Sequence, residues 1–234
     1  MQLNCDVTEC VQISNHTYKV MLKADKEISF KAGQYLFFLL NEQDKRPFSI
    51  ANVPHSQKIE LHIGASGYSD FANEVIEHIK SKKMQNQKVS IDVGHGNAWL
   101  REKSNRPKLL IAGGTGFSYV KSIMEKVILD NQDETIFVYW GTKTKKDLYC
   151  HQQVLAYQQK YKNFNYEATI ESNESHWNGR YGNVLDVLDK DFIDYSSYDI
   201  YICGPVPMVG RARDMLITKG ALLEHMYADA FDYI

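Results

Sequence analysis

A glycine-rich run near the middle of the chain has the composition of a phosphate-binding turn. Gly113-Gly114-Thr115-Gly116 follows four apolar residues, and apolar side chains then recur with helical spacing between residues 120 and 128. This order is typical of a buried strand, a tight turn and an amphipathic helix. Glycines let a ligand approach the backbone, and free N–H groups at a helix start bind a pyrophosphate. The run predicts a dinucleotide site; because it lacks the full G-x-G-x-x-G pattern, a turn without a ligand is the alternative.

Two other short runs carry residue types that bind or orient ligands. Arg46-Pro47-Phe48-Ser49 joins a permanent positive charge, which can reach a phosphate or a hydroxyl, to an aromatic ring and a hydroxyl group. Cys203-Gly204-Pro205 follows an apolar run and places a thiol beside a second turn. Each has a structural alternative: Arg46 as a surface residue, Ser49 as a turn cap, and Cys203 as a packing residue.

Other classes of function have little support in the composition. The net charge of −2 gives no reason to expect nucleic acid or an acidic membrane surface as a partner. Four cysteines form no C-x-x-C motif and eight histidines no H-x-x-x-H pattern, so we expect neither a metal nor an iron–sulfur centre. No apolar run has membrane-spanning length and the N-terminus lacks a signal pattern, so we expect a cytoplasmic protein.

The elements that must position these residues fall into two groups. Residues 1–103 show short alternating patterns at 5–11, 18–23, 34–40, 46–51, 59–64 and 88–93, interrupted by one helical pattern at 70–82. Strands of this length separated by turns predict a small antiparallel β-barrel. A charged segment ending at Pro107 then predicts a domain boundary.

Residues 107–234 change to alternating strands and helices. Strand patterns at 109–112, 136–140, 165–170 and 199–203 are each followed by a helical pattern. Such alternation predicts a Rossmann-like, doubly wound parallel sheet, in which ligands bind beyond the carboxyl ends of the strands. Both glycine turns fall at those ends.

The three motifs, in this order and spacing, resemble those of the ferredoxin–NADP reductase family. Arg46-Pro47-Phe48-Ser49 is similar to the family's flavin motif, Gly113-Gly114-Thr115-Gly116 to its nucleotide turn, and Cys203-Gly204-Pro205 to its C-G-P motif. The chain most resembles the small NAD(P)H:flavin reductases, and the C-G-P motif is closer to the luminescence-operon type. Phe48 departs from the tyrosine of many relatives, and residues 64–70 lack a basic partner for an FAD pyrophosphate.

The resemblance implies roles for individual residues. Ser49 and Cys203 would be the catalytic pair, the first at flavin N5 and the second beside nicotinamide C4. The flavin-binding set would be Tyr35, Arg46, Pro47, Phe48, Ser49, His62, Ile63, Gly64, Ala65, Ser66 and Phe231. The NAD(P)H-binding set would be Ile111, Ala112, Gly113, Gly114, Thr115, Gly116, Trp140, Gly141, Cys203, Gly204, Pro205 and Met208.

The implied activity is the NAD(P)H-dependent reduction of free FMN, riboflavin or FAD, supplied to another enzyme such as bacterial luciferase. Two alternatives stay open: an FAD-containing electron-transfer reductase of an oxygenase, and a flavin carrier or sensor without activity. The preferred flavin, the choice between NADH and NADPH, the route of handover and the oligomeric state are open too.

Overall fold

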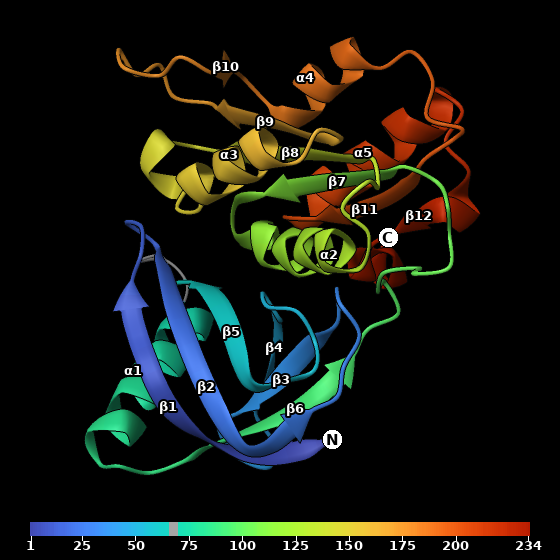
Figure 1. The fold of residues 1–234 in the computed structure, drawn as a ribbon. Helices are drawn as coiled ribbons and strands as arrows, with labels where there is room; N and C mark the ends of the chain where they lie inside the picture. Colours follow the sequence, from blue (N-terminus) through green and yellow to red (C-terminus); the bar gives the residue numbers. More distant parts are fainter. Residues whose placement is uncertain (66–69) are drawn as a thin grey trace.

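The computed structural model describes residues 1–65 and 70–234 and has two sheet-containing halves (Figure 1). The described part of the N-terminal half contains one helix, α1 (Asp70–Met84), packed beside its sheet. Its strands are β1 (Gln2–Gln12), β2 (Thr17–Ile28), β3 (Tyr35–Leu39), β4 (Lys45–Ser49), β5 (Ser56–Gly64) and β6 (Val89–His95).

The N-terminal strands confirm the expected antiparallel architecture. Their order is β4-β3-β6-β1-β2-β5, and neighbouring strands run antiparallel throughout the described residues. The outer strands approach each other through an isolated bridge between Ile50 and Leu61, so the sheet curves into a barrel without a continuous closing ladder. This closure brings the end of β4, which carries Ser49, beside the middle of β5.

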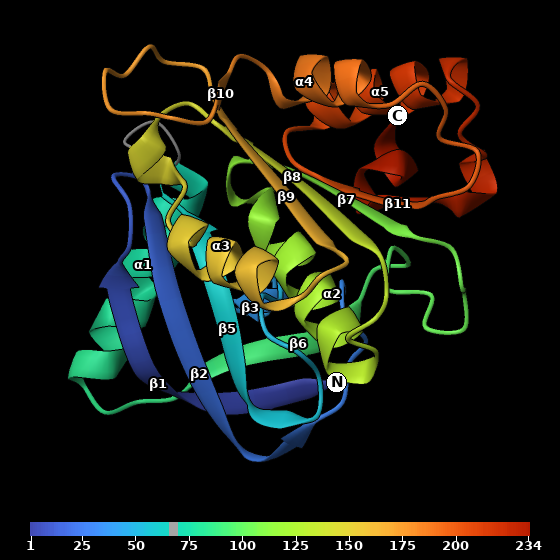
Figure 2. The ribbon, with the colours of Figure 1, turned by 45° about the horizontal axis from the view of Figure 1, so that its top comes forward.

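The C-terminal half confirms the expected parallel sheet. Its strands are β7 (Lys108–Gly113), β8 (Ile136–Thr142), β9 (Phe164–Ile170), β10 (Arg180–Tyr181), β11 (Asp199–Cys203) and β12 (Met226–Tyr227), in the order β10-β9-β8-β7-β11-β12. Its helices are α2 (Phe117–Asp130), α3 (His151–Lys160), α4 (Val184–Asp191) and α5 (Val206–Thr218). Helices α2 and α3 cover the face toward the N-terminal half, and α4 and α5 cover the other (Figures 1 and 2).

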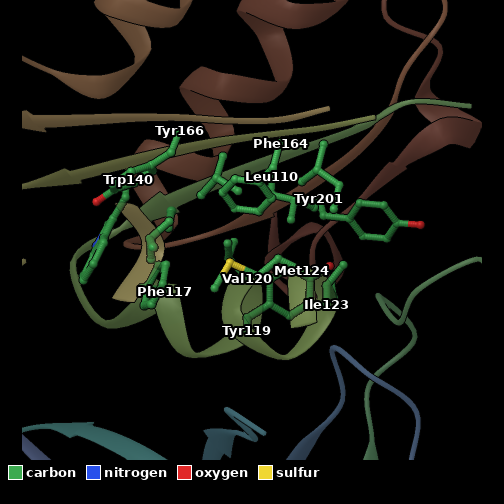
Figure 3. Close-up of a cluster of buried hydrophobic side chains, with 14 of the residues drawn as sticks. Leu110, Phe117, Tyr119, Val120, Ile123, Met124, Trp140, Phe164, Tyr166 and Tyr201 are labelled. Carbon is green, nitrogen blue, oxygen red and sulfur yellow. The ribbon is translucent and has the colours of Figure 1, made fainter. Parts of the chain in front are cut away.

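Helix α2 is buried on two sides, which explains its largely apolar sequence. One side packs under β7, β8 and β9, where Val120 and Met124 meet Leu110 (Figure 3). The other side faces the N-terminal half. Among the described residues no helix is long and apolar enough to cross a bilayer. The predicted boundary between residues 103 and 107 lies in the connection from β6 to β7 and stays a prediction.

Hydrogen bonds from the first half of α2, and one near the chain end, join the two halves. The Tyr119 hydroxyl donates to the Ala98 carbonyl at 2.6 Å, and the Ser122 hydroxyl donates to the Asn52 carbonyl at 2.8 Å. Near the chain end, Asp229 Oδ1 accepts from the backbone N–H of Asn97 at 3.2 Å. These bonds fix the orientation of α2, and with it the glycine turn that precedes α2.

A buried charge cluster strengthens this interface. Lys121, on α2, is 5% exposed and lies 3.4 Å from Glu60 of β5 and 3.1 Å from Glu125. Glu60 also pairs with His62 at 2.8 Å. Burial opposes ionisation of Glu60, but the hydrogen bond from His62 and the charge of Lys121 outweigh it and lower the pKa of Glu60 to about 2. The cluster therefore couples protonation to the attachment of the two halves.

We expect the stability of the protein to fall in acid through Glu60. A carboxyl whose folded pKa is depressed stabilises the fold above its unfolded value of about 4.3 and loses this contribution as pH falls toward 2. A difference of about two pKa units corresponds to roughly 3 kcal/mol. Urea unfolding at pH 7, 5 and 3 measures the free energy of unfolding. Below pH 5 this free energy should fall less in Glu60→Gln than in the wild type, and the exposed-site control Glu77→Gln should show the wild-type fall. An unchanged acid dependence in Glu60→Gln would contradict this role.

Candidate active site

Two adjoining cavities lie where the halves meet, at the carboxyl ends of β7 and β11. Cavity A is lined by Tyr35, Phe37, Pro47, Phe48, Ser49, Tyr119, Ile202, Cys203, Gly204, Val206, Val209, Asp229, Ala230, Asp232 and Tyr233. Cavity B is lined by Pro47, Phe48, Ser49, His62, Gly64, Phe71, Ala72, Gly113, Gly114, Thr115, Gly116, Ser118, Cys203, Gly204 and Pro205. Five of the described residues line both cavities and mark their junction: Pro47, Phe48, Ser49, Cys203 and Gly204.

The predicted catalytic pair is brought together across the two halves. Ser49 ends β4 and Cys203 ends β11, and both line the two cavities, with the Ser49 hydroxyl close enough to act on the thiol. Burial, and then the charge of Asp229, raise the pKa of Cys203 to about 12, although the Ser49 hydroxyl and the Gly204 N–H oppose the shift. At neutral pH Cys203 is therefore a protonated thiol. It can pack against a ring and hydrogen-bond, but it is not poised as a nucleophile.

Close packing explains the glycines of the nucleotide turn. A Cβ on Gly116 would collide with the Cys203 carbonyl, and one on Gly113 would collide with the sulfur of Met208. Gly114 differs, because its φ is +56° and no described atom lies within 4 Å of the place of a Cβ. The space beside Gly114 is therefore open to a ligand, while the other two glycines hold the turn against β11 and α5.

The turn is also supported from behind. Trp140, at the end of β8, stacks on Phe117 with ring centroids 3.8 Å apart, and its indole N–H donates to the Gly114 carbonyl at 2.9 Å. On the cavity side, Thr115 lies against Gly64 of β5, where a Cβ on Gly64 would approach it to 3.1 Å. The start of α2 thus lies at the wall of cavity B in a fixed position.

Several predicted residues lie outside both cavities. Ile63 and Ala65 belong to the core of the N-terminal half, and Ile111 and Ala112 to the core of the C-terminal half. Trp140 and Met208 lie behind the turns and hold them in place, whereas Gly141 packs against α4 and β9. Ser66 lies outside the described residues. The ligand roles of these residues stay predictions.

Arg46 is placed differently from a free phosphate ligand. Its side chain is 9% exposed and pairs with Asp44 at 2.7 Å and with Glu74 of α1. It also donates to the Phe71 carbonyl, so the guanidinium ties β4 to the first turn of α1. Two carboxylates already balance its charge, which weakens it as an anchor for an additional phosphate.

The chain end contributes residues that the sequence interpretation did not single out. Phe231 packs at the edge of the C-terminal core, whereas Ala230, Asp232 and Tyr233 line cavity A. Asp229 lines it as well, and burial raises the pKa of this carboxyl. In the terminal helical turn (Asp229–Tyr233), Tyr233 lines cavity A and Phe231 does not.

Comparisons with known proteins agree with this geometry. Residues 110–214 match the family model of the oxidoreductase NAD-binding domain. The ferredoxin reductase in carbazole 1,9a-dioxygenase superposes with a TM-score of 0.84 over 99% of this chain and 69% of its own, at 23% identity. A flavohem-like FAD/NAD binding domain of nitric oxide dioxygenase from Vibrio cholerae gives 0.82 at 15% identity, over 96% of each chain. These neighbours establish the ferredoxin reductase-like fold.

Other proteins share a higher sequence identity with this chain than these structural neighbours do. The chain is 40% identical over 237 residues to the NAD(P)H-flavin reductase of Vibrio harveyi, with 100% of both chains covered. It is 43% identical over 235 residues to a probable flavin reductase of Photobacterium leiognathi, again over 100% of both. The chain therefore belongs to the NAD(P)H-flavin reductase family.

Proposed function

We propose that this protein reduces a free flavin with NADH or NADPH. The observation that carries the proposal is the contact between Ser49 and Cys203 at the junction of the two cavities. In this arrangement a nicotinamide carried by the C-terminal half meets a flavin ring carried by the N-terminal half. The experiment is NADH oxidation by the purified protein, which should require added flavin.

The reaction passes a hydride from nicotinamide C4 to flavin N5, so the cofactors supply the reactivity. The residues of this chain orient the two rings. The Ser49 hydroxyl donates to N5, which favours the developing N5–H group, and neutral Cys203 packs at the nicotinamide. The N–H groups at the start of α2 and the open space at Gly114 receive the pyrophosphate. Holding two flat rings in contact is itself a large part of the catalysis.

The flavin is a substrate in this proposal and leaves after reduction. Arg46 contacts the first turn of α1, but its partners are already Asp44 and Glu74. A flavin diphosphate would add negative charge next to Glu74. Loose binding suits an enzyme that passes reduced flavin to a second enzyme, and the resemblance points to a flavin-dependent monooxygenase such as bacterial luciferase.

We expect FAD to bind little better than FMN or riboflavin, each with a dissociation constant of about 1 μM. That value corresponds to roughly 8 kcal/mol, which a stacked ring and a few hydrogen bonds supply. Quenching of flavin fluorescence on titration with the three flavins measures it. Purified protein should also be colourless. A yellow protein that binds FAD a thousandfold more tightly than riboflavin, about 4 kcal/mol, would instead indicate a prosthetic FAD and an electron-transfer reductase.

A further inference from the structure

One ring nitrogen of His62 is buried at cavity B without a hydrogen-bond partner. The His62 side chain is 1% exposed, and its Nε2 lies 2.8 Å from Glu60 Oε1. Across the described residues, its Nδ1 has no partner. A buried polar atom without a partner costs free energy. A nitrogen left in this state at a cavity wall is therefore an indication of a ligand atom.

The groups around His62 determine which of its ring nitrogens carries a proton, and therefore whether Nδ1 donates or accepts a hydrogen bond. The Glu60 carboxylate accepts only, so Nε2 carries the proton, and in a neutral imidazole Nδ1 is then a bare acceptor. The other charged groups that act on His62 are Lys121 of α2 and Lys19 of β2, and the Tyr149 ring meets it edge-on at 5.0 Å. Burial lowers the pKa of His62, and both lysines act in the same direction against Glu60. His62 is thus neutral at physiological pH.

We propose that His62 Nδ1 accepts a hydrogen bond from a hydroxyl of the flavin ribityl chain, so that Glu60 and His62 together recognise the polyol part of the substrate. This inference rests on the proposed function and adds a specificity residue to it. A bare acceptor rejects phosphate oxygens, which accept as well, and binds a hydroxyl, which donates.

The position of His62 favours the flavin over the nucleotide as the source of that hydroxyl. Phe48 and Ser49 line both cavities, and His62 lies on β5, which meets the end of β4 through the Ile50–Leu61 bridge. A flavin whose ring lies at Ser49 therefore has His62 on its own half of the molecule. The start of α2, where the nucleotide pyrophosphate is expected, lines the same cavity but belongs to the C-terminal half.

The test compares riboflavin with lumiflavin, which has the same ring and a methyl group in place of the ribityl chain. Equilibrium binding is measured by fluorescence quenching without NADH, so the result does not depend on turnover. We expect His62→Leu to weaken riboflavin binding about fivefold to tenfold and to leave lumiflavin unchanged, in line with one neutral hydrogen bond. His62→Asn, whose Oδ1 stands near the place of Nδ1, should restore most of the difference.

Two further measurements complete the test. In ¹⁵N-histidine NMR, His62 Nδ1 should be unprotonated and should shift on adding riboflavin but not lumiflavin. His78→Leu, a histidine of α1 packed on Phe38, is the matched control and should bind both flavins as the wild type does. Equal weakening of both flavins in His62→Leu would overturn the proposal, as would an effect confined to the KM for NADH. Failure of the proposed function itself would appear separately, as wild-type protein that binds flavin but does not oxidise NADH.

Discussion

Gly114→Val should raise the KM for NADH about 100-fold or more while flavin binding stays near the wild-type value. The place of its Cβ is open and faces cavity B, where we expect the pyrophosphate to touch the backbone. A branched side chain there separates the phosphate oxygens from the N–H groups at the start of α2. Losing charge-assisted hydrogen bonds of about 1.5 to 3 kcal/mol each accounts for the size of the effect. Steady-state kinetics with NADH varied measures it.

Backbone strain needs a control, because valine is disfavoured at the positive φ of Gly114. Gly182 provides one: its φ is +109°, it has equally open space around the place of a Cβ, and it lies outside both cavities. Gly182→Val should lower thermal stability without changing the KM for NADH. A folded Gly114→Val with wild-type NADH kinetics would remove the nucleotide from this turn.

Ser49→Ala should lower turnover by about 10- to 100-fold and change flavin affinity much less. A hydrogen bond that strengthens as N5 gains the hydride acts on the transition state more than on the bound substrate. Ser49 ends β4 and already lines both cavities, so its hydroxyl stands where the ring is expected. Rapid-mixing measurement of flavin reduction, with riboflavin titration alongside, separates the chemical step from binding.

Two variants accompany it. Ser49→Thr keeps a hydroxyl and should keep most of the turnover. Ser122→Ala removes a buried hydroxyl that bonds the Asn52 carbonyl at the interface, so it should cost stability without slowing the chemical step. Wild-type turnover in Ser49→Ala would make Ser49 a turn residue alone.

Local sequence patterns were sufficient for the framework of the fold. The apolar run before Gly113 and the helical spacing from residue 120 correspond to β7 (Lys108–Gly113) and α2 (Phe117–Asp130). These elements were predictable because the periodicity of burial and the conformational freedom of glycine act over a few residues. The pairing of Ser49 with Cys203 could be predicted only from the family resemblance, because the two residues lie in different halves of the molecule and no local pattern relates them.

Contacts between distant residues account for what the sequence interpretation missed. From the sequence alone, Lys121 has the pattern of a residue on the polar face of a helix. Its burial could not be predicted, because its partner Glu60 lies 61 residues away on another sheet. Arg46 is interpreted from the sequence as a residue that reaches a phosphate or a hydroxyl, and its pairing with Glu74, 28 residues on, could not be predicted from local sequence. At the chain end, the helical turn over Asp229–Tyr233 determines that Tyr233 lines cavity A and that Phe231 does not. An alternating sequence pattern does not predict which way the side chains of such a turn point.

The bonds across the interface bear on how such chains can recombine. A crossover between residues 103 and 107 would cut no strand or helix, so it is the natural place to join halves from two relatives. It would nevertheless take Glu60 and Lys121 from different parents, and the backbone N–H of residue 97 would depend on the other parent for Asp229. Chimaeras in which both members of an interface pair come from the same parent should fold. Chimaeras in which the two members come from different parents and no longer match should lose the alignment of the flavin and nicotinamide rings. The two contacting faces of the interface must therefore be exchanged together, because neither half alone carries the complete interface.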